Sequence, residues 1–277
     1  MSVLTSEAVV LRTWPVHEAD LIVSFFTRDY GRMRGVAKSA LKSRKRFGGA
    51  LEPMTLARAW FAEKPRQELV RLDQLELLRS PLATPVDQVR LTVLSFFAEL
   101  LDEVLPEHDP QETVFRLLVS VLEQTTAVQS EIVQPQSAIP SSNGPTSGGP
   151  TFSGPTSTGP WMALTYFSLW MTRLMGLLPD IAHCTECGEA LKAGEIWFQS
   201  FGDGLFCEVH RGSGANALSA DSWQLAQRML RAPVASFAAE PWPRRRGTDL
   251  RRFTLQSLER HLERKLRTAE ALGRLGG

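Results

Sequence analysis

The spacing of apolar positions divides the chain into a strand-rich first part and a helix-rich remainder. Between Thr5 and Leu78, short runs rich in β-branched and aromatic residues alternate with polar turns such as "RDYG" and "EKPRQ". About five strands are expected, in the segments "EAVVLRTW", "ADLIVSFFT", "RMRGVA", "MTLARAWFA" and "ELVRLDQLELL". Closely spaced strands in this number favour a small barrel, and the OB-fold is a five-stranded barrel.

After Ser80 the apolar positions follow the period of a helix. The first helix is expected in "TPVDQVRLTVLSFFAELLDEVL", with Thr84 and Pro85 at its cap and first turn. Further helices are expected in "QETVFRLLVSVLEQ", in "PWMALTYFSLWMTRLMGLL" up to Pro179, in "SADSWQLAQRMLRA", and in one helix from Asp249 to Leu272. The pattern predicts an α+β protein, with a five-stranded OB-fold barrel at residues 1–79 and an α-helical domain at 80–277.

A segment at about residues 127–159 interrupts the helices. It contains "SAIPSSNGPTSGGPTFSGPTSTGP", which is rich in Ser, Gly and Pro and has few side chains that could form a core. We expect a disordered insertion. A catalytic lid is the functional alternative, but this composition is more typical of a flexible linker.

The composition excludes several classes of protein but does not identify a binding partner. The chain of 277 residues is 43% hydrophobic and has a formal net charge of +1, as in an ordinary globular protein. Its apolar runs are too short or too broken for a transmembrane helix, and the N-terminus lacks the pattern of a secretory signal. A cytoplasmic location is therefore expected. The three cysteines are too few for a disulfide framework.

All three cysteines lie in one loop at about residues 183–211. Cys184, Cys187, Cys207 and His210 form a C-x2-C…C-x2-H pattern with nineteen residues between the pairs. This spacing is typical of a zinc site in which two tight turns supply two ligands each. Four protein ligands leave no position for a catalytic water, so we expect one structural zinc ion. His183 is the alternative fourth ligand. Chance thiols with a surface histidine are the non-functional alternative, and the use of every cysteine in one pattern favours zinc over it.

Positive charge gathers between Gly31 and Gly49, in "GRMRGVAKSALKSRKRFGG". This stretch has no acidic residue, and Ser39 and Ser43 add hydroxyls that can bind phosphate oxygens. The sequence therefore indicates a nucleic-acid-binding surface, although a charge run is usually a solvated face. Its candidate residues are Arg32, Arg34, Lys38, Lys42, Arg44, Lys45 and Arg46.

Other features leave alternatives open. Tyr30, Trp60 and Phe61 could stack on bases or form barrel core, and "PRRRGTDLRR" is a second basic cluster. The sequence contains no P-loop, nucleotide-binding glycine fingerprint or G-x-S-x-G motif, so no enzyme activity is expected. A zinc-ribbon scaffold that binds only protein is the main alternative, and a metal-dependent enzyme acting on nucleic acid is a third.

Two segments resemble a bacterial DNA repair family. Residues 17–54, "HEADLIVSFFTRDYGRMRGVAKSALKSRKRFGGALEPM", resemble the N-terminal domain of RecO proteins, and "MGLLPDIAHCTECGEAL" resembles the entrance to their zinc region. The order of barrel, helices, zinc loop and terminal helix also fits. Many relatives have cysteine where His210 stands, and some lack the site.

The resemblance implies a non-enzymatic recombination mediator. Such a protein binds single-stranded and double-stranded DNA, anneals complementary strands and partners with RecR. Together they help RecA displace the single-strand-binding protein, SSB. By resemblance the DNA face comprises the seven basic residues named above, and the free protein is expected to be a monomer associated with the nucleoid.

Overall fold

The structure is a computed structural model that describes residues 3–63, 67–84, 86–126, 158–243 and 245–276. The insertion expected at 127–159 lies outside the described residues except for Thr158 and Gly159. These two residues begin helix α4, so the helix starts slightly earlier than the sequence pattern suggested.

The N-terminal part is a closed barrel with strand order β1-β2-β3-β5-β4. Strand β1 pairs antiparallel with both β2 and β4, which closes the sheet, and β3 pairs with β5 in parallel. The predicted five-stranded barrel is confirmed. Its strands are β1 (Leu4–Pro15), β2 (Leu21–Thr27), β3 (Gly31–Ala37), β4 (Leu56–Ala62) and β5 (Val70–Arg79).

Alternating side chains of the strands fill the barrel. Phe25, Phe47 and Phe61 are buried in its core, and Phe61 contacts Phe25 and Tyr30 edge-on, at 5.7 and 5.5 Å between ring centroids. Trp60 is half-buried. Of the aromatic side chains proposed for base stacking, Phe61 therefore belongs to the core, because it stabilises the barrel from inside.

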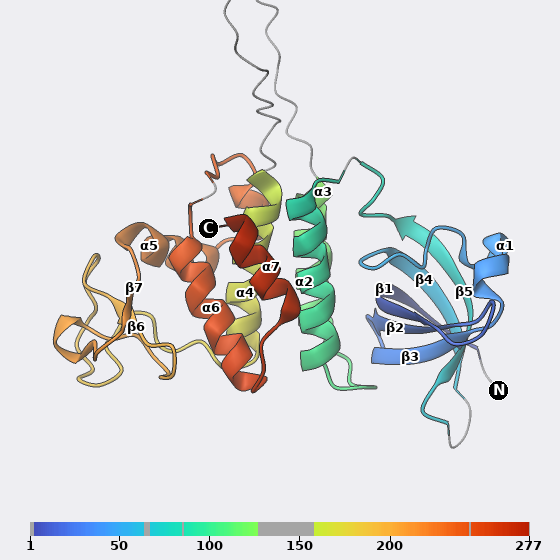
Figure 1. The fold of residues 1–277 in the computed structure, drawn as a ribbon, viewed down its shortest axis with the longest axis horizontal. Helices are drawn as coiled ribbons and strands as arrows, with labels where there is room; N and C mark the ends of the chain where they lie inside the picture. The colour runs from blue at the N-terminus through green and yellow to red at the C-terminus, as the bar shows by residue number, and fades with distance from the viewer. Residues whose placement is uncertain (1–2, 64–66, 85, 127–157, 244, 277) are drawn as a thin grey trace, which may run out of the picture.

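The helical domain packs beside the barrel (Figure 1), and no described helix is both long and apolar enough to cross a membrane. The cap of the first long helix differs from the prediction at Thr84, because the carboxylate of Asp87 accepts the N–H of Arg90 at 2.7 Å. The helices are α2 (Gln88–Val104), α3 (Glu112–Thr126), α4 (Thr158–Leu174), α5 (Ala220–Met229), α6 (Thr248–His261) and α7 (Arg267–Gly276).

The prediction of one C-terminal helix from Asp249 to Leu272 is wrong. Helix α6 ends at His261, and Glu263 takes a left-handed backbone conformation with φ 54°. The second helix, α7, then packs against α2, where Glu99 accepts the N–H groups of Arg267 and Thr268 at 3.0 and 2.9 Å. A carboxylate from a distant helix thus satisfies the first N–H groups of α7, which the local sequence could not show.

A second hydrophobic cluster, separate from the cluster inside the barrel, joins the barrel to the helices. Phe26 of β2 contacts Phe115 of α3 at 5.5 Å between centroids, and Val9 and Leu11 of β1 join the same cluster. Gly31 lies so close to the backbone of Asp109 that a Cβ atom would come within 2.3 Å of its carbonyl oxygen. The interface is therefore tightly packed, and it fixes how the barrel faces the helices.

Candidate metal centre and candidate nucleic-acid interface

The two ends of the long loop bring the three cysteines and one histidine together. One ligand atom from each of Cys184, Cys187, Cys207 and His210 lies within 4.8 Å of all the others. The Nδ1 atom of His210 lies 3.2 Å from the Sγ of Cys207 and 3.9 Å from that of Cys184. Three sulfurs and one imidazole in a cluster of this size could hold a metal ion, and they suit zinc in kind and number.

Two tight turns build this metal-ligand group. In the first turn, Gly188 donates its N–H to the carbonyl of Cys184 at 2.9 Å and takes a φ of 71°, which glycine adopts without strain. In the second turn, His210 donates its N–H to the carbonyl of Cys207 at 3.1 Å. Thr185 and Leu205 link the turns through a backbone hydrogen bond of 2.9 Å. The ligands are therefore preorganised by the backbone.

The backbone also favours the thiolate form of Cys184. Burial alone would raise the pKa of this thiol, but the N–H groups of Cys187, Cys207 and Glu186, together with the side chain of Cys187, lower the pKa to about 6. A thiolate is the form that binds metal. The local hydrogen bonds thus prepare Cys184 to be a ligand.

His183, the alternative fourth ligand, lies outside this group. Its side chain is exposed, and its Nδ1 atom pairs with the carboxylate of Asp180 at 2.7 Å. The imidazole of His210 occupies the place beside the sulfurs instead.

The basic stretch forms strand β3 and then the cationic turn, residues 38–47. This turn contains a 3-10 helix, η1 (Ala40–Lys42), and the single helical turn α1 (Arg44–Phe47). Arg46 holds it together, donating hydrogen bonds to the carbonyl of Lys38 at 2.6 Å and to the hydroxyl of Ser43 at 3.0 Å. Phe47 anchors the end of the turn in the barrel core. The turn therefore has a defined shape.

Four cations of the cationic turn remain available to a ligand. Lys38, Lys42, Arg44 and Lys45 are exposed, and none forms an ion pair with another described residue. We call these four residues the exposed cations. They create a positive surface at the end of the barrel away from the helices, where Figure 1 shows α1.

Arg32 and Arg34 differ from the exposed cations. Glu107, in the segment between α2 and α3, lies 3.2 Å from Arg32 and 2.7 Å from Arg34, and Arg32 also donates to the carbonyl of Leu105. Asp102 adds a carboxylate 3.7 Å from Arg32. The stretch has no acidic residue of its own, but carboxylates from distant positions in the sequence neutralise these two arginines. No local pattern could have revealed that pairing.

Two family descriptions together match most of the chain. "Recombination protein O N terminal" matches residues 1–81, and "Recombination protein O C terminal" matches residues 85–134 and 154–270. The chain belongs to the RecO family. The DNA repair protein RecO of Koribacter versatilis is 44% identical over 270 residues, which are 98% of each chain. The RecO protein of Anaeromyxobacter sp. strain K is 29% identical over 97% of this chain and 95% of its own.

Membership of the RecO family assigns the chain to recombinational DNA repair, and it confirms the resemblance seen in the two sequence segments. In this RecO family member, a groove of about 490 Å³ begins beside the cationic turn. Lys38 and Glu68 line it together with Arg71, which pairs with Asp73 at 2.7 Å, and Val36 and Val70 contribute apolar surface. The groove therefore offers a shallow path from the exposed cations along the seam between β3 and β5.

The second basic cluster is partly neutralised. Glu240 pairs with both Arg228 and Arg246, whereas Arg245 and Arg252 are exposed and form no ion pair with a described residue. These arginines line a hollow that also contains Asp221 and Asp249. The mixture of charges makes this surface a weaker anion site than the cationic turn.

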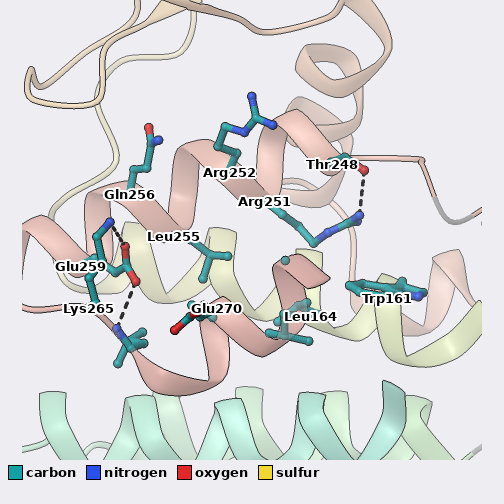
Figure 2. Close-up of a pocket in the computed structure, with 14 residues that line it drawn as sticks. Trp161, Leu164, Thr248, Arg251, Arg252, Leu255, Gln256, Glu259, Lys265 and Glu270 are labelled. Carbon is teal, nitrogen blue, oxygen red and sulfur yellow. Dashed lines mark hydrogen bonds and ion pairs between the residues drawn. The ribbon is translucent and has the colours of Figure 1, made fainter. Parts of the chain in front are cut away.

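A further pocket of the RecO fold lies between α4, α6 and α7 (Figure 2). Its volume is about 550 Å³, and Trp161, Leu164 and Leu255 provide apolar lining. Arg252 and Lys265 stand at its edge in the close-up, and Lys265 pairs with Glu259 at 2.7 Å. The sequence pattern missed this pocket because it is formed by the break between α6 and α7.

Proposed function

We propose that this RecO family member is a non-enzymatic recombination mediator that binds both single-stranded and double-stranded DNA. In this role it anneals complementary strands and, with RecR, helps RecA load onto DNA covered by SSB. The observation that carries the proposal is the cationic turn, whose exposed cations have no carboxylate partner among the described residues. Family membership supplies the biological setting.

The chemistry of the turn suits the phosphate backbone. Lysine and arginine side chains that neutralise phosphates release bound counterions, so they bind any sequence. A positive surface also reduces the repulsion between two strands and raises their local concentration. Base pairing then provides sequence fidelity. Arg32 and Arg34 support the docking of the barrel onto the helices, and the DNA surface is assigned to the exposed cations with Arg46 as their organiser.

We further propose that the metal-ligand group holds one structural zinc ion. Cys184, Cys187, Cys207 and His210 provide its four ligands. The zinc holds the two turns together when bound, and the chain's own hydrogen bonds set the positions of those turns. The protein acts in the cytoplasm at the nucleoid and is a monomer when free.

Protein partners need a second surface. The pocket between α4, α6 and α7 has an apolar lining with both cations and the carboxylates of Glu259 and Glu270 around it, so it fits a peptide that inserts apolar side chains. It lies on the helical domain, away from α1 in Figure 1. DNA and a partner such as SSB can therefore be bound at separate places.

The test of the DNA surface is the salt dependence of binding. Changing Lys38, Lys42, Arg44 and Lys45 together to Ala should lower the slope of log affinity against log salt, by roughly 0.7 to 0.9 for each phosphate that is no longer neutralised. The control changes four solvent-exposed basic residues of the helical domain to Ala, namely Arg116, Lys192, Arg231 and Arg267. Arg46 is kept, because its loss would disturb the turn itself.

The same pair of variants tests the biological role. The wild-type protein and the control should anneal SSB-coated complementary strands, and the variant without exposed cations should do so more slowly. A protein that anneals equally well after loss of these cations, with an unchanged salt slope, would contradict the proposed surface. It would favour the scaffold that binds only protein.

A further inference from the structure

Leu41 is the exposed apolar side chain of the cationic turn. It is 60% exposed, whereas Ala40 and Phe47 of the same turn are buried in the barrel core. A single leucine at a surface is common and needs no explanation by itself. Its surroundings are unusual, because the exposed cations flank it on both sides in the sequence.

The backbone keeps Leu41 in this outward position. Its N–H bonds to the carbonyl of Ala19 at 3.2 Å, and Ser39 donates its N–H to the carboxylate of Asp20 at 2.7 Å. The inward position of η1 is already filled by Ala40. Leu41 therefore cannot turn into the core without breaking the hydrogen bonds between the cationic turn and the β1–β2 connection.

The neighbouring cations indicate which kind of ligand can bring an apolar surface onto this leucine. Lys38 precedes Leu41 in the same turn and Lys42, Arg44 and Lys45 follow it, so phosphates bound by these cations would bring a strand to the turn. A leucine side chain cannot hydrogen-bond to phosphate, but it gains free energy when an apolar surface covers it. The apolar surfaces of a nucleic acid are the faces of its bases.

We infer that Leu41 packs against the faces of unpaired bases, so that the cationic turn holds a single strand through its bases as well as its phosphates. The inference rests on the proposed DNA-binding function and deepens it. In a duplex the base faces are stacked, and an aliphatic wedge reaches them only when a base step is opened, which has a free-energy cost. Leu41 thus favours single-stranded DNA over duplex.

The test uses the full chain and three DNA probes of equal length: a single strand, a duplex, and a single strand of abasic sites. Leu41→Ala should weaken binding of the normal single strand by roughly three- to tenfold, as expected when one partly covered aliphatic side chain is removed. Binding of the duplex and the abasic strand should change by less than about twofold, and the salt slope should stay the same, because the cations that bind phosphate remain. Leu41→Met should restore binding of the single strand.

The control is Leu91→Ala, which removes a leucine of similar exposure, 53%, from helix α2. A 2-aminopurine placed in the single strand reports stacking directly, and its fluorescence on binding should differ between the wild type and Leu41→Ala. Equal weakening on the normal and abasic strands, or no weakening on either, would overturn the inference. If removal of the exposed cations leaves binding intact, the proposed DNA surface fails instead, so the two failures are distinguishable.

Discussion

Arg32 and Arg44 belong to one basic stretch, but only Arg44 presents its charge to solvent. The side chain of Arg32 is 15% exposed and lies between the carboxylates of Asp102 and Glu107. An ion pair at such a largely buried place fixes two elements relative to each other. Removing one partner leaves the other charge poorly solvated. The function of each arginine therefore depends on its tertiary neighbours.

The two histidines of the metal loop allow a residue-level prediction. His210→Ala should lower the zinc content from about one ion per chain and reduce the thermal stability, because a structural zinc site needs its fourth ligand. His183→Ala should retain the metal, because His183 pairs with Asp180 outside the ligand group. Elemental analysis and thermal unfolding of the two variants provide the measurement. Equal zinc contents in both variants would contradict the assignment of His210.

At the level of elements, α7 depends on a carboxylate from α2. Glu99 is 8% exposed, and its oxygens accept the N–H groups of Arg267 and Thr268 and the hydroxyl of Thr268. Burial alone would raise the pKa of Glu99, but these hydrogen bonds and the charge of Arg264 together lower it. The carboxylate thus stabilises the folded protein while it is ionised.

The lowered pKa of Glu99 predicts how the stability of the protein changes with pH. A carboxyl group with a lowered pKa in the folded state contributes stability above its unfolded pKa and loses that stability as the pH falls through the folded pKa. Glu99→Gln should therefore lower the free energy of unfolding by about 1.5 to 3 kcal/mol at pH 7. The difference from the wild type should shrink in acid.

Glu103→Gln, one turn along the same helix, is the matched control. Glu103 pairs with Arg264 at 2.5 Å but receives no backbone N–H from the described residues, so its loss should cost less than about 1 kcal/mol. Denaturant unfolding from pH 7 down to a pH below the folded pKa of Glu99 compares the two variants. A loss for Glu99→Gln that does not depend on pH would contradict the role of its charge.

On the scale of the whole molecule, the barrel and the loop that carries the metal ligands lie at opposite ends, with helices between them (Figure 1). The core that runs from Phe26 through Phe115 into the helices makes the barrel and the helical domain a packed unit. The DNA surface and the metal loop are thus held apart, and a contact at one end leaves the other accessible.

The segment between α3 and α4 should be replaceable without loss of the fold. A Cβ atom on Gly159 would lie 2.6 Å from the carbonyl oxygen of Gln124, so the two helices meet where the segment leaves and re-enters the helical domain. Replacing residues 130–155 by a short Gly/Ser linker should therefore keep the melting temperature within about 3 °C, because surface loops of different length change stability little. DNA affinity should also be retained.

Differential scanning calorimetry and DNA titration of this variant provide the check. A matched replacement of equal length by a scrambled order of the same residues separates composition from sequence. A large fall in melting temperature for both replacements would show that the native segment packs against the described core.

The sequence by itself determined the local patterns. Short runs rich in β-branched and aromatic residues predicted the five strands, and four runs with helical spacing predicted α2 to α5. The C-x2-C and C-x2-H pairs identified all four members of the metal-ligand group, because metal ligands need short turns that sequence spacing reveals. Resemblance in two segments gave the family.

Only the tertiary structure decided which basic side chains of the stretch remain exposed to solvent. It also decided where the predicted C-terminal helix is interrupted, between α6 and α7. Glu107 neutralises Arg32 and Arg34 across more than seventy positions in the sequence, and Glu99 caps α7 from even farther away. Such long-range contacts follow from how the barrel and helices pack, and no local pattern records them. The same packing leaves Lys42, Arg44 and Lys45 open to solvent, since helices α2 to α7 lie on the other side of the barrel.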